Sequence, residues 1–188
     1  MSEDQGATTP ASLVEKFAEW IPDKARILDI GGAHAVDLKP LAKNGCQVTT
    51  LAAKKDSSRA GLTKVTADFM SYEPPRVFDV ILCFDLMQTL KYQECASLVT
   101  RLHQWLKPGG TLFLTTLHLE DVEFEKYVAT WERRGIRSFR SPSGKEHRLF
   151  LEKGELLQLF FRWQTVHHWE GVDAATGAGI VEAVLTCP

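Results

Sequence analysis

The chain has 188 residues, enough for one domain with a substantial hydrophobic core. Its 22 Lys and Arg residues nearly balance 24 Asp and Glu residues, so the net charge of −2 gives no electrostatic reason to expect binding to nucleic acid or to an anionic membrane. No apolar stretch is long enough to cross a bilayer, no signal-peptide pattern opens the chain, and four scattered cysteines lack the spacing of a zinc site; we therefore expect a reduced, cytoplasmic protein without a metal.

Residues 1–10 are polar and are expected to be disordered, and residues 11–188 are expected to form a single domain. Ser12 can cap a first helix whose apolar residues recur at helical spacing. The apolar run Ile27–Ile30 then predicts a strand that breaks at Gly31-Gly32 and passes into a helix. Strand, glycine turn and helix in this order form the first unit of a nucleotide-binding α/β sheet, although a plain connection without a ligand has the same pattern.

Strands and helices alternate along the rest of the chain. The run Phe78–Phe84 is apolar apart from Asp79, which is typical of a central parallel strand buried on both faces. The basic segment 135–146 lacks periodicity and is expected to be a loop or lid. The other expected elements are strands at 46–51, 62–67 and 111–117, helices at 93–106, 121–134 and 154–163, and a hairpin at 165–170 and 180–186. This pattern predicts an α/β fold: a Rossmann-like, doubly wound sheet of about seven strands, mostly parallel, with a C-terminal antiparallel β-hairpin.

Three segments in this order, LDIGG, FDVILCFDLM and LKPGGTLFLTTLHLED, resemble the class I S-adenosylmethionine-dependent methyltransferases. The C-terminal segment LFLEKGELLQLFFRWQTVHHWEG looks like the equivalent part of the small tellurite-resistance-type methyltransferases. The resemblance covers residues 25–186 and implies a class I methyltransferase fold, S-adenosylmethionine as cofactor and a small molecule as methyl acceptor. Such methyl transfer requires mainly alignment and exclusion of water, so a nucleophile–base pair need not be present.

The resemblance also implies a cofactor site, residue by residue. Asp29 would approach the methionine amino group, and the two glycines of the turn would let the backbone lie close to the cofactor. Asp68 would accept a hydrogen bond from the adenine amine, and residues 83–85 would line the pocket beside the methyl group. The complete implied set is Asp29, Gly31, Gly32, His34, Ala52, Asp68, Phe69, Cys83, Phe84 and Asp85.

Two parts of this site depart from the family pattern. Ala33 and Ala35 stand where the turn has glycines, and a left-handed conformation at a non-glycine residue costs roughly 1–2 kcal/mol. His34 between them either contacts the cofactor carboxylate or is simply exposed. Ala52 stands where a ribose-binding acid is expected, and losing a charged hydrogen bond of about 1.5–3 kcal/mol weakens binding roughly tenfold to a hundredfold. The departures motivate an alternative: a non-catalytic methyltransferase-like domain with an eroded cofactor site, serving as a binding or assembly module.

A second alternative keeps the site but changes the ligand. Lys54, Lys55 and Arg59 lie where the acid is missing, and they could accept the ribose 2′-phosphate of NADP. The LKPGG segment and the terminal hairpin argue against this alternative.

Candidate catalytic groups follow the fifth predicted strand. His118 is the candidate general base and Asp121 its candidate partner, because substrates enter this fold at the carboxyl edge of the sheet; a surface histidine at a helix start is the competing interpretation. In the tellurite-type relatives, basic residues near His147 and Arg148 would hold an oxyanion. A solvated basic loop is the simpler interpretation of that segment.

Overall fold

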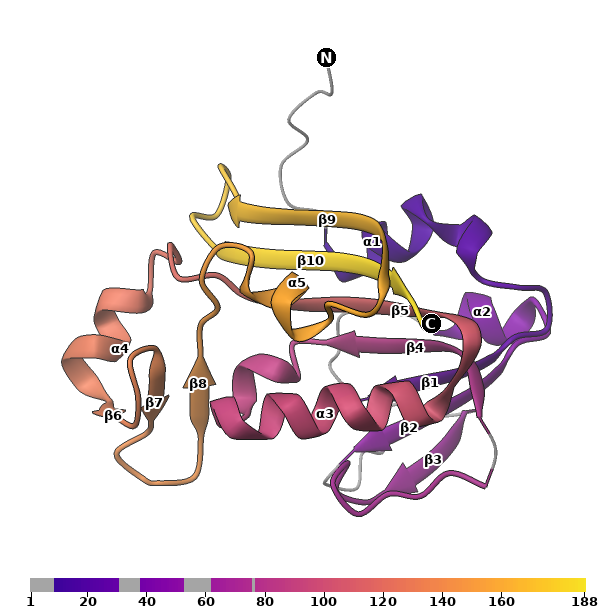
Figure 1. The fold of residues 1–188 in the computed structure, drawn as a ribbon, viewed down its shortest axis with the longest axis horizontal. Helices are drawn as coiled ribbons and strands as arrows, with labels where there is room; N and C mark the ends of the chain where they lie inside the picture. The colour runs from indigo at the N-terminus through magenta and orange to yellow at the C-terminus, as the bar shows by residue number, and fades with distance from the viewer. Residues whose placement is uncertain (1–8, 31–37, 53–61, 76) are drawn as a thin grey trace.

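The computed structural model describes residues 9–30, 38–52, 62–75 and 77–188, and Figure 1 shows the path of the chain. The described residues form a seven-stranded sheet in the order β3-β2-β1-β4-β5-β10-β9 and a small sheet in the order β6-β7-β8. The strands of the large sheet are β1 (Arg26–Ile30), β2 (Gln47–Ala52), β3 (Thr63–Thr66), β4 (Phe78–Phe84), β5 (Leu106–Leu117), β9 (Gln164–Val172) and β10 (Gly179–Thr186). The strands of the small sheet are β6 (Glu132–Arg133), β7 (Ser138–Arg140) and β8 (His147–Leu149).

The direction of the strands in the large sheet follows the predicted pattern. Strands β3, β2, β1, β4 and β5 are parallel to one another, whereas β10 is antiparallel to both β5 and β9. The chain runs outward from β1 to β2 and β3 and then returns to β4 on the other side of β1. This reversal makes the carboxyl ends of β1 and β4 a topological switch point, which is where ligands bind in open α/β sheets. The predicted doubly wound sheet with a C-terminal antiparallel hairpin is confirmed.

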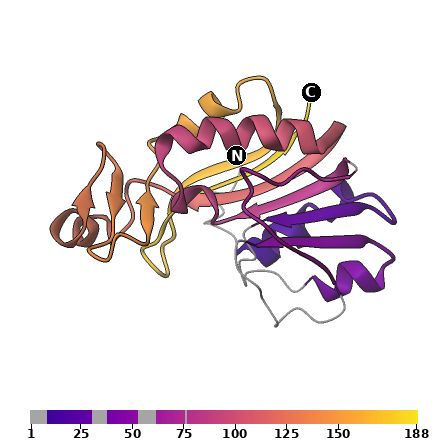
Figure 2. The same ribbon diagram turned by 90° about the horizontal axis from the view of Figure 1, so that it is seen from below.

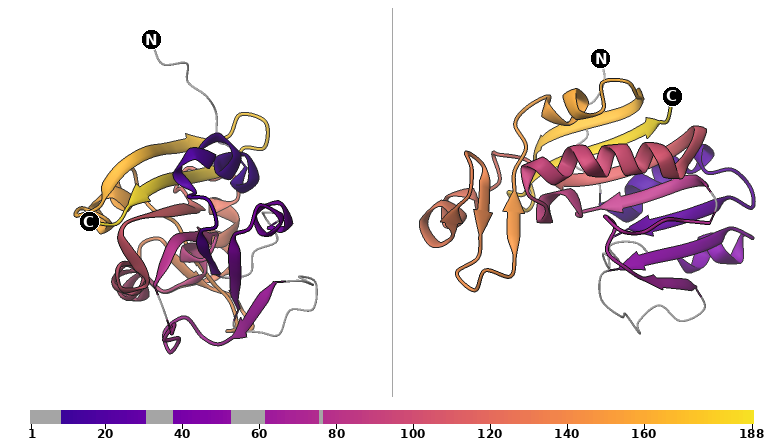
Figure 3. Two further views of the ribbon diagram at one scale, coloured as in Figure 1. Left: turned by 90° about the vertical axis from the view of Figure 1, so that its right-hand side faces the viewer. Right: turned by 60° about the horizontal axis from the view of Figure 1, so that its bottom comes forward.

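Helices cover both faces of the large sheet (Figures 2 and 3). They are α1 (Pro10–Lys16), α2 (Lys39–Lys43), α3 (Tyr92–Trp105) and α5 (Glu155–Leu159), with the 3-10 turns η1 (Ala18–Trp20) and η2 (Met87–Thr89). Helix α4 (Phe124–Thr130) lies beside the small sheet instead. Strand β4 supplies both halves of the core, because its side chains alternate between the faces. Val80 and Leu82 belong to the apolar cluster that includes α1, and Ile81 and Cys83 to the cluster that includes α3.

The first helix begins earlier than the sequence predicted. Thr9 caps α1, since its hydroxyl oxygen accepts a 3.2 Å hydrogen bond from the backbone N–H of Ser12. The expectation that Ser12 is the cap was therefore wrong; the Ser12 hydroxyl instead donates to the Thr9 carbonyl at 3.0 Å. Residues 1–8, expected to be disordered, lie outside the described residues, and the single-domain expectation stays a prediction.

The LKPGG segment belongs to β5 instead of preceding it. The pairing of β4 with β5 shifts register between Phe78 and Val80, opposite this segment. Gly109 has a φ of +73°, and a Cβ on Gly110 would lie 2.9 Å from the Lys107 carbonyl oxygen and 3.0 Å from that of Asp79. Both glycines are thus required for the chain to leave α3 and enter the sheet directly.

The region after β5 differs most from the prediction. The helices expected at 121–134 and 154–163 are shorter, as α4 and α5, and the segment 135–146, expected as a loop, contains β7 and the turn to β8. We call residues 119–150 the cap. It contains α4 and the small sheet, and it lies beyond the carboxyl ends of β4 and β5 (Figures 1 and 2).

The two ends of the cap lie side by side at the end of β5. His118 forms a parallel bridge with Leu151. The Leu151 N–H donates to the Leu117 carbonyl at 3.0 Å, and the Leu119 N–H donates to the Leu151 carbonyl at 2.9 Å. The cap therefore leaves the large sheet and returns to it at one place.

Candidate functional site

The carboxyl edge of the large sheet gathers the described part of the predicted cofactor site. Asp29 is 3% exposed in β1 and lies next to Leu82 of β4 in the register. Ala52 ends β2 and is half-buried, and its carbonyl accepts a 3.1 Å hydrogen bond from Ala67, next to Asp68. Ala52 therefore lies at the end of β2, as the sequence predicted, and its side chain at this position is a methyl group instead of an acid. The predictions for Gly31, Gly32 and His34, and the positions Ala33, Ala35, Lys54, Lys55 and Arg59, lie outside the described residues.

Asp68 and Phe69 follow β3 in a tight turn. The Asp68 carboxylate is exposed and accepts a 3.1 Å hydrogen bond from the Met70 N–H, and the Asp68 carbonyl accepts from the Tyr72 N–H at 3.0 Å. Phe69 is half-buried against the core cluster that includes α3. Both residues lie directly after a strand of the sheet, as the predicted role next to a bound adenine requires.

Asp85 closes β4 in a left-handed backbone conformation, with a φ of +55°. Its N–H donates to the Thr115 carbonyl, and its Oδ1 accepts from the Thr115 hydroxyl, both at 3.0 Å. Burial raises the pKa of Asp85, while the Thr115 hydrogen bond and the Arg148 charge oppose this rise. Strained non-glycine residues and buried carboxylates cluster at functional sites, so this turn is a strong candidate for ligand contact.

Cys83 lies directly beneath this turn. Burial raises the pKa of its thiol well above the ordinary value, and the carboxylates of Asp29 and Asp85 raise it further. A thiol held neutral in this way is a poor nucleophile. Cys83 can therefore contribute shape and a weak hydrogen bond to the site but is not suited to covalent chemistry.

His118 is 4% exposed, which excludes the surface interpretation. Its Nδ1 accepts a 3.3 Å hydrogen bond from the Glu120 N–H, and its Nε2 is buried without a hydrogen-bond partner among the described residues. The neutral ring must consequently carry its proton on Nε2. Asp121 uses its carboxylate elsewhere, accepting from the N–H groups of Glu123 and Gly179 at 2.8 Å each. The Asp121 backbone N–H donates to the His118 carbonyl at 3.1 Å, but among the described residues no hydrogen bond joins the Asp121 carboxylate to the His118 ring, and their catalytic roles stay a prediction.

The cap is held together by aromatic side chains that the sequence analysis did not single out. Phe150 and Phe139 are fully buried, and both make edge-to-face contacts with Phe124 of α4, with ring centroids 5.1 and 5.6 Å apart. Tyr127 also packs on Phe150, at 5.5 Å. This cluster fixes α4 to the small sheet.

Arg137 and Arg148 connect the cap to the rest of the fold. Arg137 forms a bidentate ion pair with Glu155 of α5, with distances of 2.7 and 2.9 Å, and also pairs with Glu152. Arg148 donates to the Tyr127 hydroxyl at 3.3 Å, and its positive charge lowers the pKa of Asp85. The basic residues of this segment are thus partly structural, because Arg137 ties the cap to α5 and Arg148 binds α4 within the cap.

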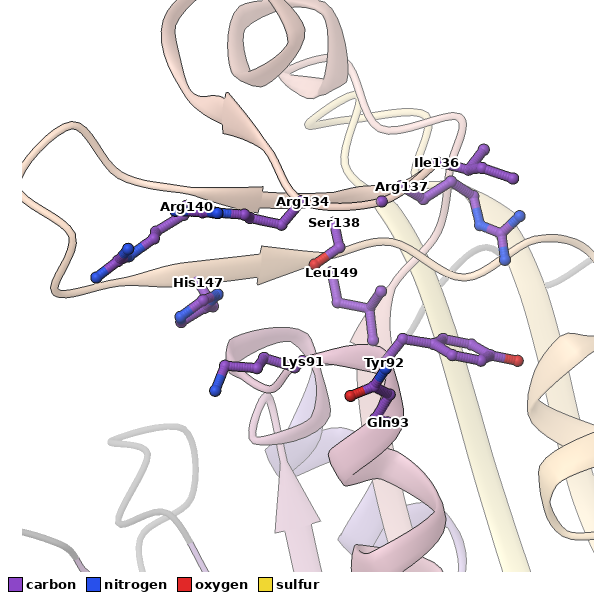
Figure 4. A pocket seen from close by; sticks show the side chains of 11 residues that line it. Lys91, Tyr92, Gln93, Arg134, Ile136, Arg137, Ser138, Arg140, His147 and Leu149 are labelled. Atoms are coloured by element: carbon purple, nitrogen blue, oxygen red, sulfur yellow. The ribbon is translucent and has the colours of Figure 1, made fainter.

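A cavity of about 730 Å³ lies between the small sheet and the N-terminal end of α3 (Figure 4). Strand β8 packs against η2, the turn that leads from Asp85 to this cavity. The walls of the cavity are formed by Lys91, Tyr92, Gln93, Arg134, Gly135, Ile136, Arg137, Ser138, Arg140, His147 and Leu149. Cavities of a few hundred cubic ångströms accommodate small organic molecules. Sequence reasoning missed residues 91–93, because they belong to the start of α3 and are separated along the chain from the cap residues that line the cavity with them.

A family model described as a methyltransferase domain matches residues 3–175, which is most of the chain. The chain belongs to this methyltransferase-domain family. Two solved methyltransferases that share the fold, from Burkholderia thailandensis and Bradyrhizobium japonicum, have S-adenosylhomocysteine bound. The predicted resemblance to class I methyltransferases is thereby confirmed.

Individual relatives of this methyltransferase domain are distant. The ubiquinone biosynthesis O-methyltransferase of Pseudomonas aeruginosa is 27% identical over 144 residues, which cover 64% of this chain and 61% of the relative. That of Colwellia psychrerythraea is 24% identical over 162 residues, which cover 80% of this chain and 63% of the relative. The matches to this chain span about three fifths of the length of these curated relatives.

Solved methyltransferase structures share the fold. The 1,6-didemethyltoxoflavin-N1-methyltransferase of Burkholderia thailandensis has a TM-score of 0.70 at 15% identity, covering 95% of this chain and 76% of its own. TehB of Haemophilus influenzae has a TM-score of 0.67 at 12% identity, covering 94% of this chain and 62% of its own. At these identities the likeness concerns the fold alone.

The described residues of the methyltransferase domain fit S-adenosylmethionine. This cofactor carries an ammonium and a sulfonium cation, and the carboxylates of Asp29 and Asp85 lie at the adjacent ends of β1 and β4. Within the described ranges, no group of three or more His, Cys, Asp or Glu side chains could hold a metal ion, and no helix is long and apolar enough to cross a membrane.

Proposed function

We propose that this chain is an S-adenosylmethionine-dependent methyltransferase that acts on a small-molecule acceptor. The observation that carries the proposal is the cavity of about 730 Å³ beside the Asp85 turn, in a chain of the methyltransferase-domain family. The switch point at the carboxyl ends of β1 and β4 would hold the cofactor, and the cavity supplies room for the acceptor. The ubiquinone-biosynthesis and toxoflavin-pathway names of its relatives, which denote enzymes of small molecules, support this division.

In this proposal the chain binds, orients and shields. Asp29 and Asp85 hold the cationic part of the cofactor, and Asp68 and Phe69 hold its adenine; the bound cofactor supplies an electrophilic methyl group. Burial disfavours the ionised form of Asp85, and the positive charge of Arg148 offsets part of this cost because it favours the carboxylate. The cap excludes water from the carboxyl end of β4. Alignment and exclusion of water are the main requirements of this reaction.

Proton removal from the acceptor is the second task. His118 is the proposed base, but its Nδ1 lone pair already accepts from the Glu120 N–H. Nε2 carries the proton of the neutral ring and donates. His118 can accept a proton from a substrate only after the Glu120 hydrogen bond opens. Asp121, its proposed partner, lies at the start of the cap.

One observation favours the alternative of a non-catalytic domain. Ala52 stands at the end of β2, where it cannot bind a ribose hydroxyl through an acid. The missing hydrogen bonds would weaken cofactor binding about tenfold to a hundredfold. A domain without measurable cofactor affinity would then serve as a binding or assembly module.

Calorimetric titration with S-adenosylmethionine and S-adenosylhomocysteine separates the two functions. We expect micromolar binding of both, and about tenfold weaker binding to Asp85→Asn, because asparagine tolerates the left-handed turn but carries no charge. Asp23→Asn is the matched control, since Asp23 is an exposed acid at the opposite end of β1. Absence of binding to the folded wild-type protein would exclude the methyltransferase and leave the non-catalytic domain.

A further inference from the structure

The hairpin of β7 and β8 presents two different faces. Phe139 pairs with Arg148 in the register, and this face packs on α4 and its aromatic cluster. Ser138 and Arg140 alternate with Phe139 along β7, and they pair with Leu149 and His147. These four residues line the cavity. The cap therefore turns an apolar face toward its own helix and a basic face toward the cavity.

The cavity wall carries positive charge without acidic side chains. Lys91, Arg134, Arg137 and Arg140 are cationic, and the wall includes no Asp or Glu. Three of these cations have a carboxylate nearby that lies outside the wall: Arg134 pairs with Glu132 at 2.9 Å, and Arg137 pairs with Glu155 at 2.7 Å. Lys91 lies 3.5 Å from the Glu94 carboxylate. The excess of positive charge is thus concentrated at Arg140.

Arg140 has no acidic partner within the described ranges. Its Nε donates to the Gly144 carbonyl at 3.1 Å, and its guanidinium lies over the Gly144 backbone in the turn between β7 and β8. This contact fixes the side chain and leaves the other nitrogen atoms of the guanidinium without a carboxylate. An arginine held in this way is prepared for a bidentate contact with a carboxylate or phosphate.

Two more donors lie at the same end of the cavity. Figure 4 shows Lys91 on the lower wall and His147 on the upper wall, both extending toward the side of Arg140. The Nδ1 of His147 is buried and has no hydrogen-bond partner within the described ranges. A buried polar atom without a partner costs free energy, so this nitrogen atom is available to a bound group. Lys91 is held loosely, 3.5 Å from the exposed Glu94 carboxylate.

The geometry points to an acceptor that carries an anionic group, a carboxylate. We call the end of the cavity that would bind this carboxylate, formed by Arg140, His147 and Lys91, the seat. This inference rests on the proposed function and assigns its substrate class: a small organic acid. Arg140, His147 and Lys91 would bind the carboxylate, while Tyr92, Ile136 and Leu149 contact the carbon skeleton. A cavity of about 730 Å³ is far larger than an inorganic oxyanion, which favours an organic body.

Binding of paired probes tests the seat without any methyl transfer. Benzoate and phenylacetate are titrated against their amides, benzamide and phenylacetamide, which have the same shape and no charge. We expect the wild-type protein to bind at least one carboxylate tenfold or more tightly than its amide. Arg140→Gln and His147→Gln each remove this preference, because each deletes a charge-assisted or buried donor.

Arg162→Gln is the matched control, since Arg162 is an exposed arginine at the end of α5, and its guanidinium lies over the Phe161 ring. Circular dichroism verifies that every variant is folded. Equal binding of acids and amides, no binding of either acid, or undiminished preference in Arg140→Gln would overturn the inference. Tighter binding of inorganic phosphate than of both acids would overturn the inference that the acceptor is an organic acid and would indicate an oxyanion site instead.

The outcome is independent of the cofactor titration. Loss of the carboxylate preference with intact S-adenosylmethionine binding would reject the anionic acceptor and keep the methyltransferase. Carboxylate binding in a protein that ignores the cofactor would reject the methyltransferase and keep the seat as a binding site.

Discussion

Thr115 and Asp85 hold each other by two hydrogen bonds, one from the Asp85 N–H to the Thr115 carbonyl and one from the Thr115 hydroxyl to the Asp85 carboxylate, both 3.0 Å long. The pair keeps a buried acid in a left-handed turn at the end of β4. Neither burial of the charge nor the backbone conformation favours folding. Strained and buried groups of this kind cluster at functional sites, which is why the proposed function places the cofactor at this turn.

The first prediction concerns the pH dependence of stability at this turn. Because burial raises the pKa of Asp85, the folded state favours the protonated acid, and the ionised acid costs stability once the pH rises through the elevated pKa. Asp85→Asn should thus be more stable than wild type at pH 7, with the difference vanishing as the pH falls below the ordinary Asp value. Thermal unfolding at pH 7 and pH 3.5 measures this difference. A gain that persists at the lower pH would contradict the explanation.

The second prediction concerns the attachment of the cap to α5. Arg137→Gln leaves the buried Glu155 carboxylate without its bidentate partner and should lower the free energy of unfolding by about 3–5 kcal/mol. The double variant Arg137→Gln/Glu155→Gln should recover most of this loss, because the uncompensated charge is gone. Urea denaturation of the two single variants and the double variant gives the coupling energy. Additive effects would show that the pair is not energetically linked.

The third prediction concerns the thiols. Burial raises the pKa of Cys83 and Cys187, and it raises the pKa of Cys95 to about 12. Cys46 is half-exposed. With a disulfide reagent at pH 8, about one thiol should react quickly in the folded protein, since only accessible thiolates attack. All four should react in guanidinium chloride, and Cys46→Ser should abolish the fast reaction. A fast phase that persists in this variant would show that a buried thiol is accessible.

The fourth prediction concerns the tautomer of His118. The Glu120 N–H donates to Nδ1, so the neutral ring should carry its proton on Nε2. Nitrogen-15 NMR of the imidazole rings distinguishes the two tautomers, and the signal missing from His118→Gln identifies the residue. A proton on Nδ1 would show that the Glu120 hydrogen bond is absent in solution, and would free Nε2 to act as a base.

The large sheet could be predicted because its signals are local. The run Phe78–Phe84 is apolar on both faces, and the segment LKPGG marks the junction of α3 with β5. The cap could not, because β7 and β8 have three residues each and alternate for too short a distance. The ring of Phe139 packs on Phe124 of α4 and on Phe150, which come from other parts of the cap.

The candidate site could likewise be predicted only in part. Asp85 follows a recognisable strand, so its place at the carboxyl edge could be predicted, whereas its left-handed conformation and the Thr115 contact depend on a neighbouring strand. The basic residues near His147 were visible in the sequence, but their two roles were not. Arg148 faces Tyr127 and Asp85, and His147 faces the cavity, because adjacent residues of a strand point in opposite directions.

The bridge between His118 and Leu151 makes residues 119–150 a cassette whose two ends already touch. Segments with adjoining ends on the rim of a sheet tolerate replacement and changes of length, because the surrounding backbone does not have to move. A shorter or longer cassette could therefore alter the acceptor while β1, β4 and the cofactor edge stay the same. Replacement of this segment is therefore the starting point for redesigning the acceptor site of this chain.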